Sequence, residues 1–333
     1  MANQSILFTS PGIAELVDKP LPQIKEDEVL IRILRTTVSA GTERANLVGD
    51  PNVSPKVPFP RALGYSATGI VEAVGRDVTT VLVGDRVACS WTKHAQYCAV
   101  KESRVYPLSE DIGDDAGALV HIATFPAAAI RKCRLEFGES AIVMGLGVLG
   151  LITVELLRLA GAAPIIAVDP VAEKRELARK LGADHALDPF APDFAQTVKE
   201  ITGGGAAVAI EITGKGQGLD MVLDCMKKFG RVALLGCTRS SDFSIDYYKK
   251  VHGPGITLIG AHTNARPKHE SAEGRWTEAD DARAIIRLMQ YQRLDLAHLV
   301  EEIHSPEEAP EIYTRLANSP AFPIVQFDWR KIQ

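Results

Sequence analysis

Hydrophobic and polar positions along the chain change their rhythm twice. Up to about residue 120 the apolar residues form short, β-branched, alternating runs separated by Gly and Pro, at 29–34, 69–75 and 84–89. Alternation over four to eight residues is typical of half-buried strands. This pattern predicts a β-barrel-like domain at the start of the chain.

From about 121 to 262, strand-like apolar runs alternate with helical patterns. The runs lie at 141–144, 165–168, 208–212, 231–235 and 256–259, and the helical segments 148–160 and 173–181 each stop at a Gly. Alternation of this kind predicts a parallel sheet covered on both faces. Beyond it, residues 263–278 are polar and predict a loop, and residues 280–290 predict a helix with one apolar face.

Composition narrows the class of protein without naming a chemistry. The chain has 333 residues, is 46% hydrophobic and 24% charged, and carries a net charge of −5. This length suits two domains, and the charge and its distribution speak against nucleic acid as a partner. The sequence contains neither a membrane-length apolar stretch nor a signal-peptide pattern at its start. Five cysteines without a Cys-x-x-Cys pair are typical of a reducing compartment, so we expect a cytoplasmic protein.

A glycine-rich loop follows the apolar run 141–144. Gly145, Gly147 and Gly150, with Val148 and Leu149 between the last two, open the helical segment 148–160. Together with Asp169, 19 residues after Gly150, this context is the dinucleotide-binding fingerprint. The backbone N–H groups at such a helix N-terminus bind pyrophosphate.

Asp169 favours NAD over NADP. A carboxylate at the end of the second strand accepts hydrogen bonds from the adenosine ribose and repels a 2′-phosphate. Lys174 and Arg175, shortly after it, would soften that repulsion.

Several motifs resemble the medium-chain dehydrogenase/reductase superfamily, the zinc-type alcohol and polyol dehydrogenases. They are the segments 64–69 and 83–87, the glycine-rich loop and the segment 230–236. The resemblance implies an α/β fold with a Rossmann doubly wound parallel sheet domain and a GroES-like β-barrel catalytic domain. It divides the chain into a catalytic domain at 1–121, an NAD-binding domain at 122–262 and a return to the catalytic domain at 263–333. It also implies a small-molecule substrate, a homodimer or homotetramer, and cofactor contacts from Thr124, Thr213 and Gly236.

This sequence differs from the family's zinc-binding motifs at every primary ligand position. Ala40 stands where the family has the zinc Cys, and Tyr65 and Ser66 stand where it has His and Glu. His121 takes the place of an acid near the metal. The four-cysteine structural lobe would fall between Ala88 and Tyr97, where the sequence has only Cys89. Zinc needs three or four ligands in fixed geometry, so we expect no zinc at either site.

Side chains must then replace the metal in removing the alcohol proton and stabilising the oxyanion. His121 is the first candidate base and His94 the second, because imidazole exchanges protons near neutral pH. Tyr65 offers a phenol at the former ligand position, and Thr42 corresponds to the hydroxyl of the family's proton relay. Further candidate substrate contacts are Glu43, Trp91, His262 and Trp276.

Each of these residues also has a purely structural interpretation. Tyr65 can simply fill the space that a ligand left, Glu43 can hold Arg44 or a backbone amide, and the charged loop around Arg266 can be solvated rather than a lid over a polar substrate. A relocated metal between His94, His121 and His262 has no supporting spacing.

The prediction is therefore a zinc-independent, NAD-dependent oxidoreductase that interconverts a secondary alcohol and its ketone, with a sugar, polyol or cyclitol-like substrate. Two rival hypotheses stay open. One is an enone or quinone reductase of the same superfamily, which Asp169 disfavours because those enzymes commonly prefer NADP. The other is a nucleotide-binding sensor without catalysis.

Overall fold

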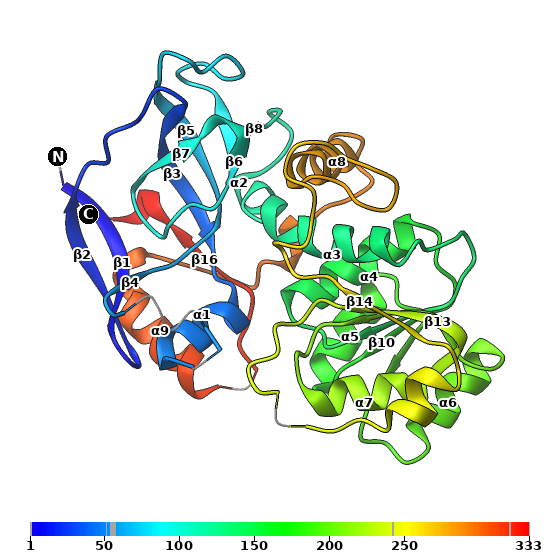
Figure 1. Ribbon diagram of the computed structural model, residues 1–333. Helices are drawn as coiled ribbons and strands as arrows, with labels where there is room; N and C mark the ends of the chain where they lie inside the picture. The colour runs from blue at the N-terminus through cyan, green and yellow to red at the C-terminus, as the bar shows by residue number, and fades with distance from the viewer. Residues whose placement is uncertain (1, 51, 54–57, 242, 320, 333) are drawn as a thin grey trace. The chain divides into compact units, whose positions relative to one another are not determined.

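The chain divides into two compact units (Figure 1). The computed structural model describes residues 2–50, 52–53, 58–241, 243–319 and 321–332. Unit 1 combines Met1–Ile122 with Ala282–Gln333, and unit 2 is Ala123–Asp281. The first and last residues of the sequence, Met1 and Gln333, lie outside the described ranges. The chain returns to unit 1 at Ala282, whereas the sequence placed the return at 263.

Unit 2 is built on a six-stranded parallel sheet. Its spatial order is β11-β10-β9-β12-β13-β14, and every neighbouring pair is parallel. In chain order the strands are β9 (Ala141–Met144), β10 (Ile165–Val168), β11 (His185–Leu187), β12 (Ala206–Glu211), β13 (Met226–Leu234) and β14 (Thr257–Gly260). The order reverses between β9 and β12, which is the arrangement of a doubly wound fold with a ligand crevice at the switch point. The expected α/β fold is confirmed.

Helices cover both faces of this sheet (Figure 1). The helices between the strands are α4 (Val148–Leu159), α5 (Ala172–Lys180), α6 (Phe194–Thr202) and α7 (Gly216–Asp224), and a π-helical turn η2 spans Tyr248–His252. Helix α4 packs beside α5, and α6 packs beside α7. Right-handed crossovers place these two pairs on opposite faces. Strands covered on both faces need continuous apolar runs, and all four residues of β9 and of β10 are buried.

Unit 1 contains two sheets. Strands β1 (Ala2–Ser10), β2 (Ile13–Pro20) and β4 (Arg61–Ala62) form one of them. The other has the order β15-β16-β3-β5-β6-β8, with β7 also pairing with β3. Its strands are β3 (Glu28–Thr37), β5 (Ser66–Val74), β6 (Arg86–Ser90), β7 (Tyr97–Lys101), β8 (Val105–Pro107), β15 (Glu302–His304) and β16 (Val325–Asp328).

The helices of the first and last chain segments complete the secondary structure. They are α1 (Ala40–Val48), α2 (Asp114–Gly117), α3 (Val120–Lys132), α8 (Glu278–Gln290) and α9 (Ala309–Asn318). Short 3-10 turns are η1 (Glu102–Arg104), η3 (Ala297–Leu299), η4 (Pro306–Glu308) and η5 (Trp329–Lys331). Of the described helices, none is at once long and apolar enough to span a bilayer.

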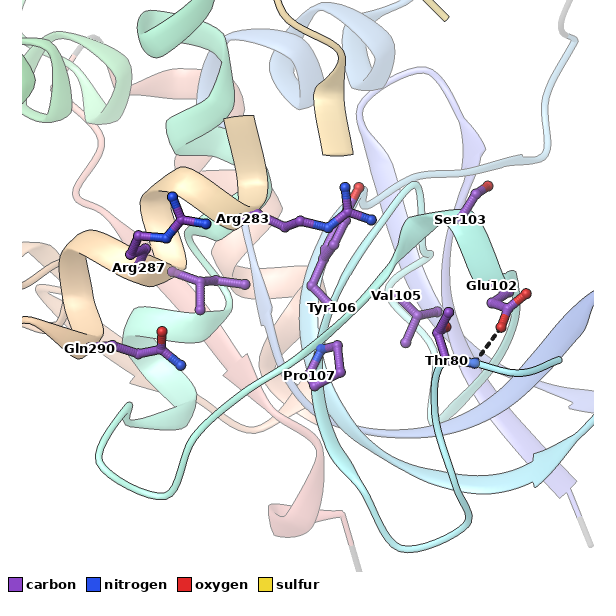
Figure 2. A pocket seen from close by; sticks show the side chains of 10 residues that line it. Thr80, Glu102, Ser103, Val105, Tyr106, Pro107, Arg283, Arg287 and Gln290 are labelled. Carbon is purple, nitrogen blue, oxygen red and sulfur yellow. Dashed lines mark hydrogen bonds between the residues drawn. The ribbon is translucent and has the colours of Figure 1, made fainter. Parts of the chain in front are cut away.

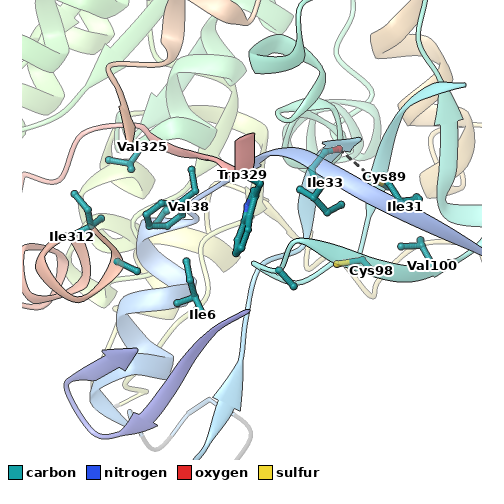
Figure 3. Packing of buried hydrophobic residues seen from close by; sticks show 14 of the residues in the cluster. Ile6, Ile31, Ile33, Val38, Cys89, Cys98, Val100, Ile312, Val325 and Trp329 are labelled. Atoms are coloured by element: carbon teal, nitrogen blue, oxygen red, sulfur yellow. Dashed lines mark hydrogen bonds between the residues drawn. The ribbon is translucent and has the colours of Figure 1, made fainter. Parts of the chain in front are cut away.

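The core of unit 1 joins residues from both ends of the chain (Figure 3). Ile31 and Ile33 of β3 pack with Ile6 of β1, Ile312 of α9 and Trp329 after β16. Burying each such side chain contributes about 1.5–3 kcal/mol, so the C-terminal segment is an integral part of this unit.

Candidate active site

The glycine-rich loop has the geometry that its sequence predicts. Gly145 has a φ of +99°, which an L side chain rarely adopts. A Cβ on Gly150 would lie 2.0 Å from the Gly145 carbonyl oxygen, so only glycine allows α4 to approach the loop this closely. At Gly147 an added Cβ would meet nothing within 4 Å, which leaves open space beside the backbone. Loop and helix N-terminus therefore form a cradle for pyrophosphate.

Asp169 ties this loop to the end of β10. One carboxylate oxygen accepts a hydrogen bond from the Leu146 N–H at 2.8 Å, and the other accepts one from the Val171 N–H at 2.9 Å. Each carboxylate oxygen has a second lone pair, so these bonds leave acceptor capacity for ribose hydroxyls. Arg175, the cation nearest to Asp169 in sequence after Lys174, donates to the backbone carbonyls of Asp169 and Pro170 at 2.7 and 2.8 Å. Its guanidinium is therefore already engaged by backbone. Lys174 is half-buried.

Thr213 and Gly236 lie at the carboxyl ends of two further strands. The buried Glu211 carboxylate accepts hydrogen bonds from the Thr213 N–H at 2.8 Å and from the Gly214 N–H at 3.2 Å. Burial raises the pKa of Glu211 against the effect of these bonds. A Cβ on Gly236 would approach the Gly214 nitrogen to 2.4 Å, so the two strand ends need a glycine there.

The ends of β9, β10, β12 and β13 are in register. Met144 pairs with Val168 and with Glu211, and Glu211 pairs with Leu234. The five expected cofactor positions that follow these strands therefore lie along one edge of the sheet. They are Gly145, Gly147, Asp169, Thr213 and Gly236. This edge, the glycine loop and the carboxylate together fit a dinucleotide.

The three residues at the expected zinc positions do not fit a metal. Ala40 opens helix α1 and has no ligand atom. Ser66 is buried, and its hydroxyl donates to the Ala118 carbonyl at 2.6 Å. The Tyr65 hydroxyl is hydrogen bonded to the Ser39 hydroxyl. Within the described residues no group of three His, Cys, Asp or Glu side chains is arranged to hold a metal ion.

Tyr65, Trp91 and His121 form an aromatic cluster in unit 1. The His121 ring centroid lies 5.5 Å from that of Tyr65 and 5.0 Å from that of Trp91, both edge to face. The Tyr65 and Trp91 ring centroids are 6.2 Å apart. The backbone N–H of Trp91 donates to the backbone carbonyl of Tyr65 at 2.7 Å. Trp91 has a φ of +60°, a conformation that costs a bulky residue about 1–3 kcal/mol. Strain of this kind is typical of functional positions.

His94 lies in a second, buried network and not in this cluster. Its Nδ1 is 2.7 Å from the Thr36 hydroxyl, and its Nε2 is 3.2 Å from both Glu43 carboxylate oxygens. His94 and Glu43 are each 1% exposed. Tyr313 of α9 donates to Glu43 at 2.5 Å. This placement does not favour the expected contact between His94 and substrate.

The charge state of this network follows from its partners. Burial acts to raise the pKa of the Glu43 carboxyl, but the facing His94 and the hydrogen bonds from His94, Tyr313 and Ser39 outweigh it, so the pKa is lowered. Burial and the neighbouring carboxylate raise the pKa of Tyr313 well above its ordinary value. Glu43 therefore holds Ser39, His94 and Tyr313 rather than Arg44, which donates to the Leu316 carbonyl.

The remaining predicted residues are dispersed. Thr42 is half-buried on α1. Thr124, in unit 2, accepts hydrogen bonds from Arg266 at 3.2 Å on its hydroxyl and 3.0 Å on its carbonyl. His262 is exposed, and its Nδ1 accepts from the Asn264 N–H at 3.1 Å. Trp276 stacks on the Arg131 guanidinium, which lies 3.4 Å from its ring centroid.

These contacts explain the displaced domain boundary. The Arg266 side chain is only 7% exposed and also faces Asp281 at 3.9 Å. With Trp276 stacked on Arg131 of α3, the segment 263–281 is held on unit 2. The Arg266 side chain is therefore not solvated, which was one of the two possibilities that the sequence left open.

A surface cavity of about 490 Å³ in unit 1 contains none of the predicted residues (Figure 2). Arg283, Arg287 and Gln290 of α8 line one side of it, and Glu102 lies on the other. Glu102 already accepts hydrogen bonds from the Thr79 and Thr80 N–H groups. The cavity is therefore separate from the groups to which the sequence assigns chemistry.

Comparisons with known proteins match both parts of the chain. Residues 25–134 match the alcohol dehydrogenase GroES-like domain, and residues 148–278 match the zinc-binding dehydrogenase family. An L-threonine 3-dehydrogenase of Caldanaerobacter subterraneus subsp. tengcongensis is 30% identical over 284 residues, which are 74% of this chain and 79% of that protein. A D-guloside 3-dehydrogenase of Escherichia coli (strain K12) is 24% identical over 334 residues, 93% of this chain and 95% of that protein.

Solved structures share the fold. A protein of Sinorhizobium meliloti 1021, solved with NADP bound, has a TM-score of 0.82 at 21% identity, covering 98% of this chain and 99% of that one. The expected GroES-like domain and the Rossmann-like parallel-sheet fold are thus both confirmed.

Proposed function

Because the chain belongs to the medium-chain dehydrogenase/reductase superfamily and is an oxidoreductase of CH–OH groups, we propose that it interconverts a secondary alcohol and its ketone with NAD and without zinc. The observation that carries this proposal is that none of the expected zinc positions, Ala40, Tyr65 and Ser66, offers a ligand to a metal, while Tyr65 lies against the His121 ring. Those ligand positions now hold a methyl group, a phenol and a hydroxyl that is bonded to backbone.

The cofactor, when bound, accepts the hydride that leaves the alcohol carbon. The glycine loop and the N-terminus of α4 would hold its pyrophosphate, and Asp169 its adenosine ribose. Asp169 supports NAD, since a 2′-phosphate would meet a buried carboxylate that is 7% exposed. Arg175, which is bonded to backbone carbonyls, is poorly placed to offset that repulsion.

The proton steps fall to side chains of unit 1. We assign the base to His121, which is 2% exposed and held edge to face between two aromatic rings. Tyr65 would donate a hydrogen bond to the substrate oxygen and stabilise the developing negative charge. Trp91 and the other apolar ring surfaces would exclude water, which strengthens both interactions. Positioned acid–base groups of this kind contribute about 100-fold to 10,000-fold in rate.

A hydroxyl-rich substrate fits this arrangement. The curated relatives act, by their names, on a guloside and on threonine, which both carry a secondary hydroxyl. We therefore infer that the substrate is a sugar, polyol or cyclitol, with hydroxyl groups that hydrogen bond to Tyr65 and Thr42.

The test combines metal removal with a substrate screen. The protein is treated with a chelator, its zinc content is measured, and NAD reduction is followed at 340 nm over sugars, polyols and cyclitols. We expect turnover without zinc, a loss of about 100-fold or more in His121→Asn, and little change in His252→Asn, which alters an exposed histidine of η2. Activity that returns only with added zinc, or equal activity in His121→Asn, would overturn the proposal.

The sheet edge at β14 supports the expected homo-oligomer. Strand β14 is the last strand of its sheet, and Thr257, Leu258 and Gly260 are exposed along it. An exposed edge strand is a template for pairing with another chain. We propose that a second copy pairs there, and a Leu258→Lys variant that keeps the mass of the wild-type oligomer in light scattering would contradict this.

A further inference from the structure

Ser39 occupies a helix N-cap without acting as a cap. Ser is among the preferred N-cap residues because its hydroxyl normally accepts a hydrogen bond from an N–H group of the first helical turn. At α1 the Ser39 side chain makes no such bond. Instead Glu43, one turn into the helix, accepts the Ser39 N–H at 2.8 Å, and the Glu43 N–H donates to the Ser39 carbonyl at 2.8 Å. The Ser39 backbone is thus fixed while its hydroxyl is released from capping.

That hydroxyl is directed to Tyr65. The Ser39 Oγ and the Tyr65 Oη form a hydrogen bond, and Ser39 is 8% exposed. The Tyr65 ring lies against His121 and Trp91 in the aromatic cluster. Tyr65 is therefore held at its ring by the cluster and at its hydroxyl by Ser39.

The anchor behind Ser39 is rigid. Glu43, which holds the Ser39 N–H, is itself bound by His94 and Tyr313. All three side chains are at most 1% exposed. Buried, fully bonded networks specify one arrangement of their members. The Ser39 backbone, from which the hydroxyl projects, is thus held by groups from α1, α9 and the loop before β7.

In the structure the Tyr65 hydroxyl donates to the Ser39 Oγ. We propose that Ser39 is a positioning residue for Tyr65. When the substrate binds, the Ser39 hydroxyl turns so that it donates to the Tyr65 Oη and leaves the phenol proton for the substrate oxygen. The proposal rests on the proposed function, and Ser39 itself does not touch the substrate. The same contact gives the buried Glu43–His94–Tyr313 network a role in the site, because the network fixes Ser39.

The direction of the hydrogen bond decides what Tyr65 can do. If Ser39 donates to the Tyr65 oxygen, the phenol proton stays available for the substrate. If Tyr65 donates to Ser39, it cannot donate to the substrate at the same time. In ketone reduction the carbonyl carbon gains a hydride from the reduced nicotinamide, and its oxygen gains a proton from protonated His121. Tyr65 then stabilises the negative charge on that oxygen during the transfer.

The kinetic test is a double-mutant cycle on ketone reduction. We expect Ser39→Ala to lower kcat by about 10-fold and Tyr65→Phe by about 100-fold. Adding Ser39→Ala to Tyr65→Phe should cause almost no further loss, because the group that Ser39 positions is gone. Ser39→Thr, which keeps the hydroxyl, should restore most of the rate. A matched control is Thr68→Val, since the buried Thr68 hydroxyl donates only to the Asp114 carbonyl at 3.0 Å.

A second measurement does not depend on activity. In protein labelled with ¹³C at the tyrosine ζ carbon, the Tyr65 signal is identified by its absence in Tyr65→Phe. It should shift in Ser39→Ala, return in Ser39→Thr and stay in place in Thr68→Val. An unmoved signal in Ser39→Ala, or an unchanged 10-fold rate loss in the Tyr65→Phe background, overturns the role of Ser39. A shifted signal in a protein that turns over no alcohol or ketone supports the hydroxyl contact and overturns the proposed function.

Discussion

The stability of unit 1 should depend on the buried Glu43 carboxylate, whatever the substrate is. Glu43 accepts hydrogen bonds from the Ser39 N–H at 2.8 Å and the Tyr313 hydroxyl at 2.5 Å, and both its oxygens lie 3.2 Å from the His94 Nε2. Replacement by Gln keeps the shape but removes the charge and turns one acceptor into a donor. That new N–H₂ group would face a donor, either the Tyr313 hydroxyl or the His94 ring.

The cost follows from burial. Leaving a buried hydrogen-bond donor without its acceptor costs about 1–3 kcal/mol, and more when the lost acceptor was a charged group. Gln retains one acceptor oxygen, so we expect Glu43→Gln to lower the free energy of unfolding of unit 1 by about 3 kcal/mol. A matched control is Glu72→Gln, since the Glu72–Arg32 pair is 37% and 40% exposed, and such surface pairs contribute about 0–1 kcal/mol.

The pH dependence has a definite sign. The pKa of Glu43 is lowered in the folded protein from its ordinary value of 4.5. A depressed carboxyl pKa stabilises the fold above the unfolded pKa, and this contribution is lost as pH falls through the folded one. The difference between wild type and Glu43→Gln should therefore be full near pH 7 and shrink below about pH 4.5.

Urea unfolding followed by tryptophan fluorescence and by far-UV circular dichroism measures this difference. Trp329 reports on the network directly, because its indole N–H donates to the Thr36 hydroxyl that also binds His94. A loss below about 1 kcal/mol at pH 7, equal to that of Glu72→Gln, would refute the idea that the buried Glu43 carboxylate holds this part of the core. So would a difference that stays constant from pH 7 to pH 4.

Three further predictions concern the cofactor cradle and the thiols. Gly150→Ala should abolish NADH binding in isothermal titration calorimetry, because its Cβ would lie 2.0 Å from the Gly145 oxygen, whereas Gly147→Ala, with open space around its Cβ, should fold normally. Asp169→Ala should weaken NADH binding about tenfold or more, because the loop loses the acceptor for the Leu146 N–H. The difference in affinity between NADH and NADPH should become smaller, and cofactor fluorescence measures both affinities. Cys237 is the exposed cysteine, and burial raises the pKa of the four others, to about 11 for Cys98 and about 12 for Cys133 and Cys225. One thiol per chain should therefore react rapidly with a disulfide reagent in the native state and five in denaturant, and fast reaction of more than one would contradict the burial.

The cofactor side of the site could be predicted because its determinants are local in sequence. Strand β9 was predicted at its observed bounds, since all four residues are apolar and a glycine follows. Helix α4 was predicted from residue 148, where it begins, because the spacing of the glycines is itself the signal. The helices α6 and α7 were not singled out, although α6 is amphipathic, because their short patterns lie between glycine-rich segments.

The substrate side could be predicted only in part, because its contacts join distant segments. Glu43 and Tyr313 are 270 positions apart, and no pattern around either residue indicates the other. Without Tyr313 and the Thr36 hydroxyl, His94 resembles a free imidazole beside the substrate, whereas the structure buries it. Ser39 was not singled out either, because no helix was predicted after it and its hydroxyl partner, Tyr65, lies 26 positions away.

The expected zinc positions show how a binding site can be converted without changing the fold. Each replacement serves the surrounding structure: Ala40 begins α1, Ser66 fastens β5 to the Ala118 carbonyl, and Tyr65 joins the Ser39 hydroxyl to the aromatic cluster. A metal needs three or four side chains that converge on one point, whereas Ala40 has no ligand atom and the Tyr65 and Ser66 hydroxyls are bonded to two different partners. Restoring a ligand at Tyr65 or Ser66 alone would therefore break one of these hydrogen bonds without creating a site. The proposed zinc-free chemistry and the packing of unit 1 thus share Tyr65, which is why Tyr65 and the neighbouring His121 are the positions where the proposed function should be tested first.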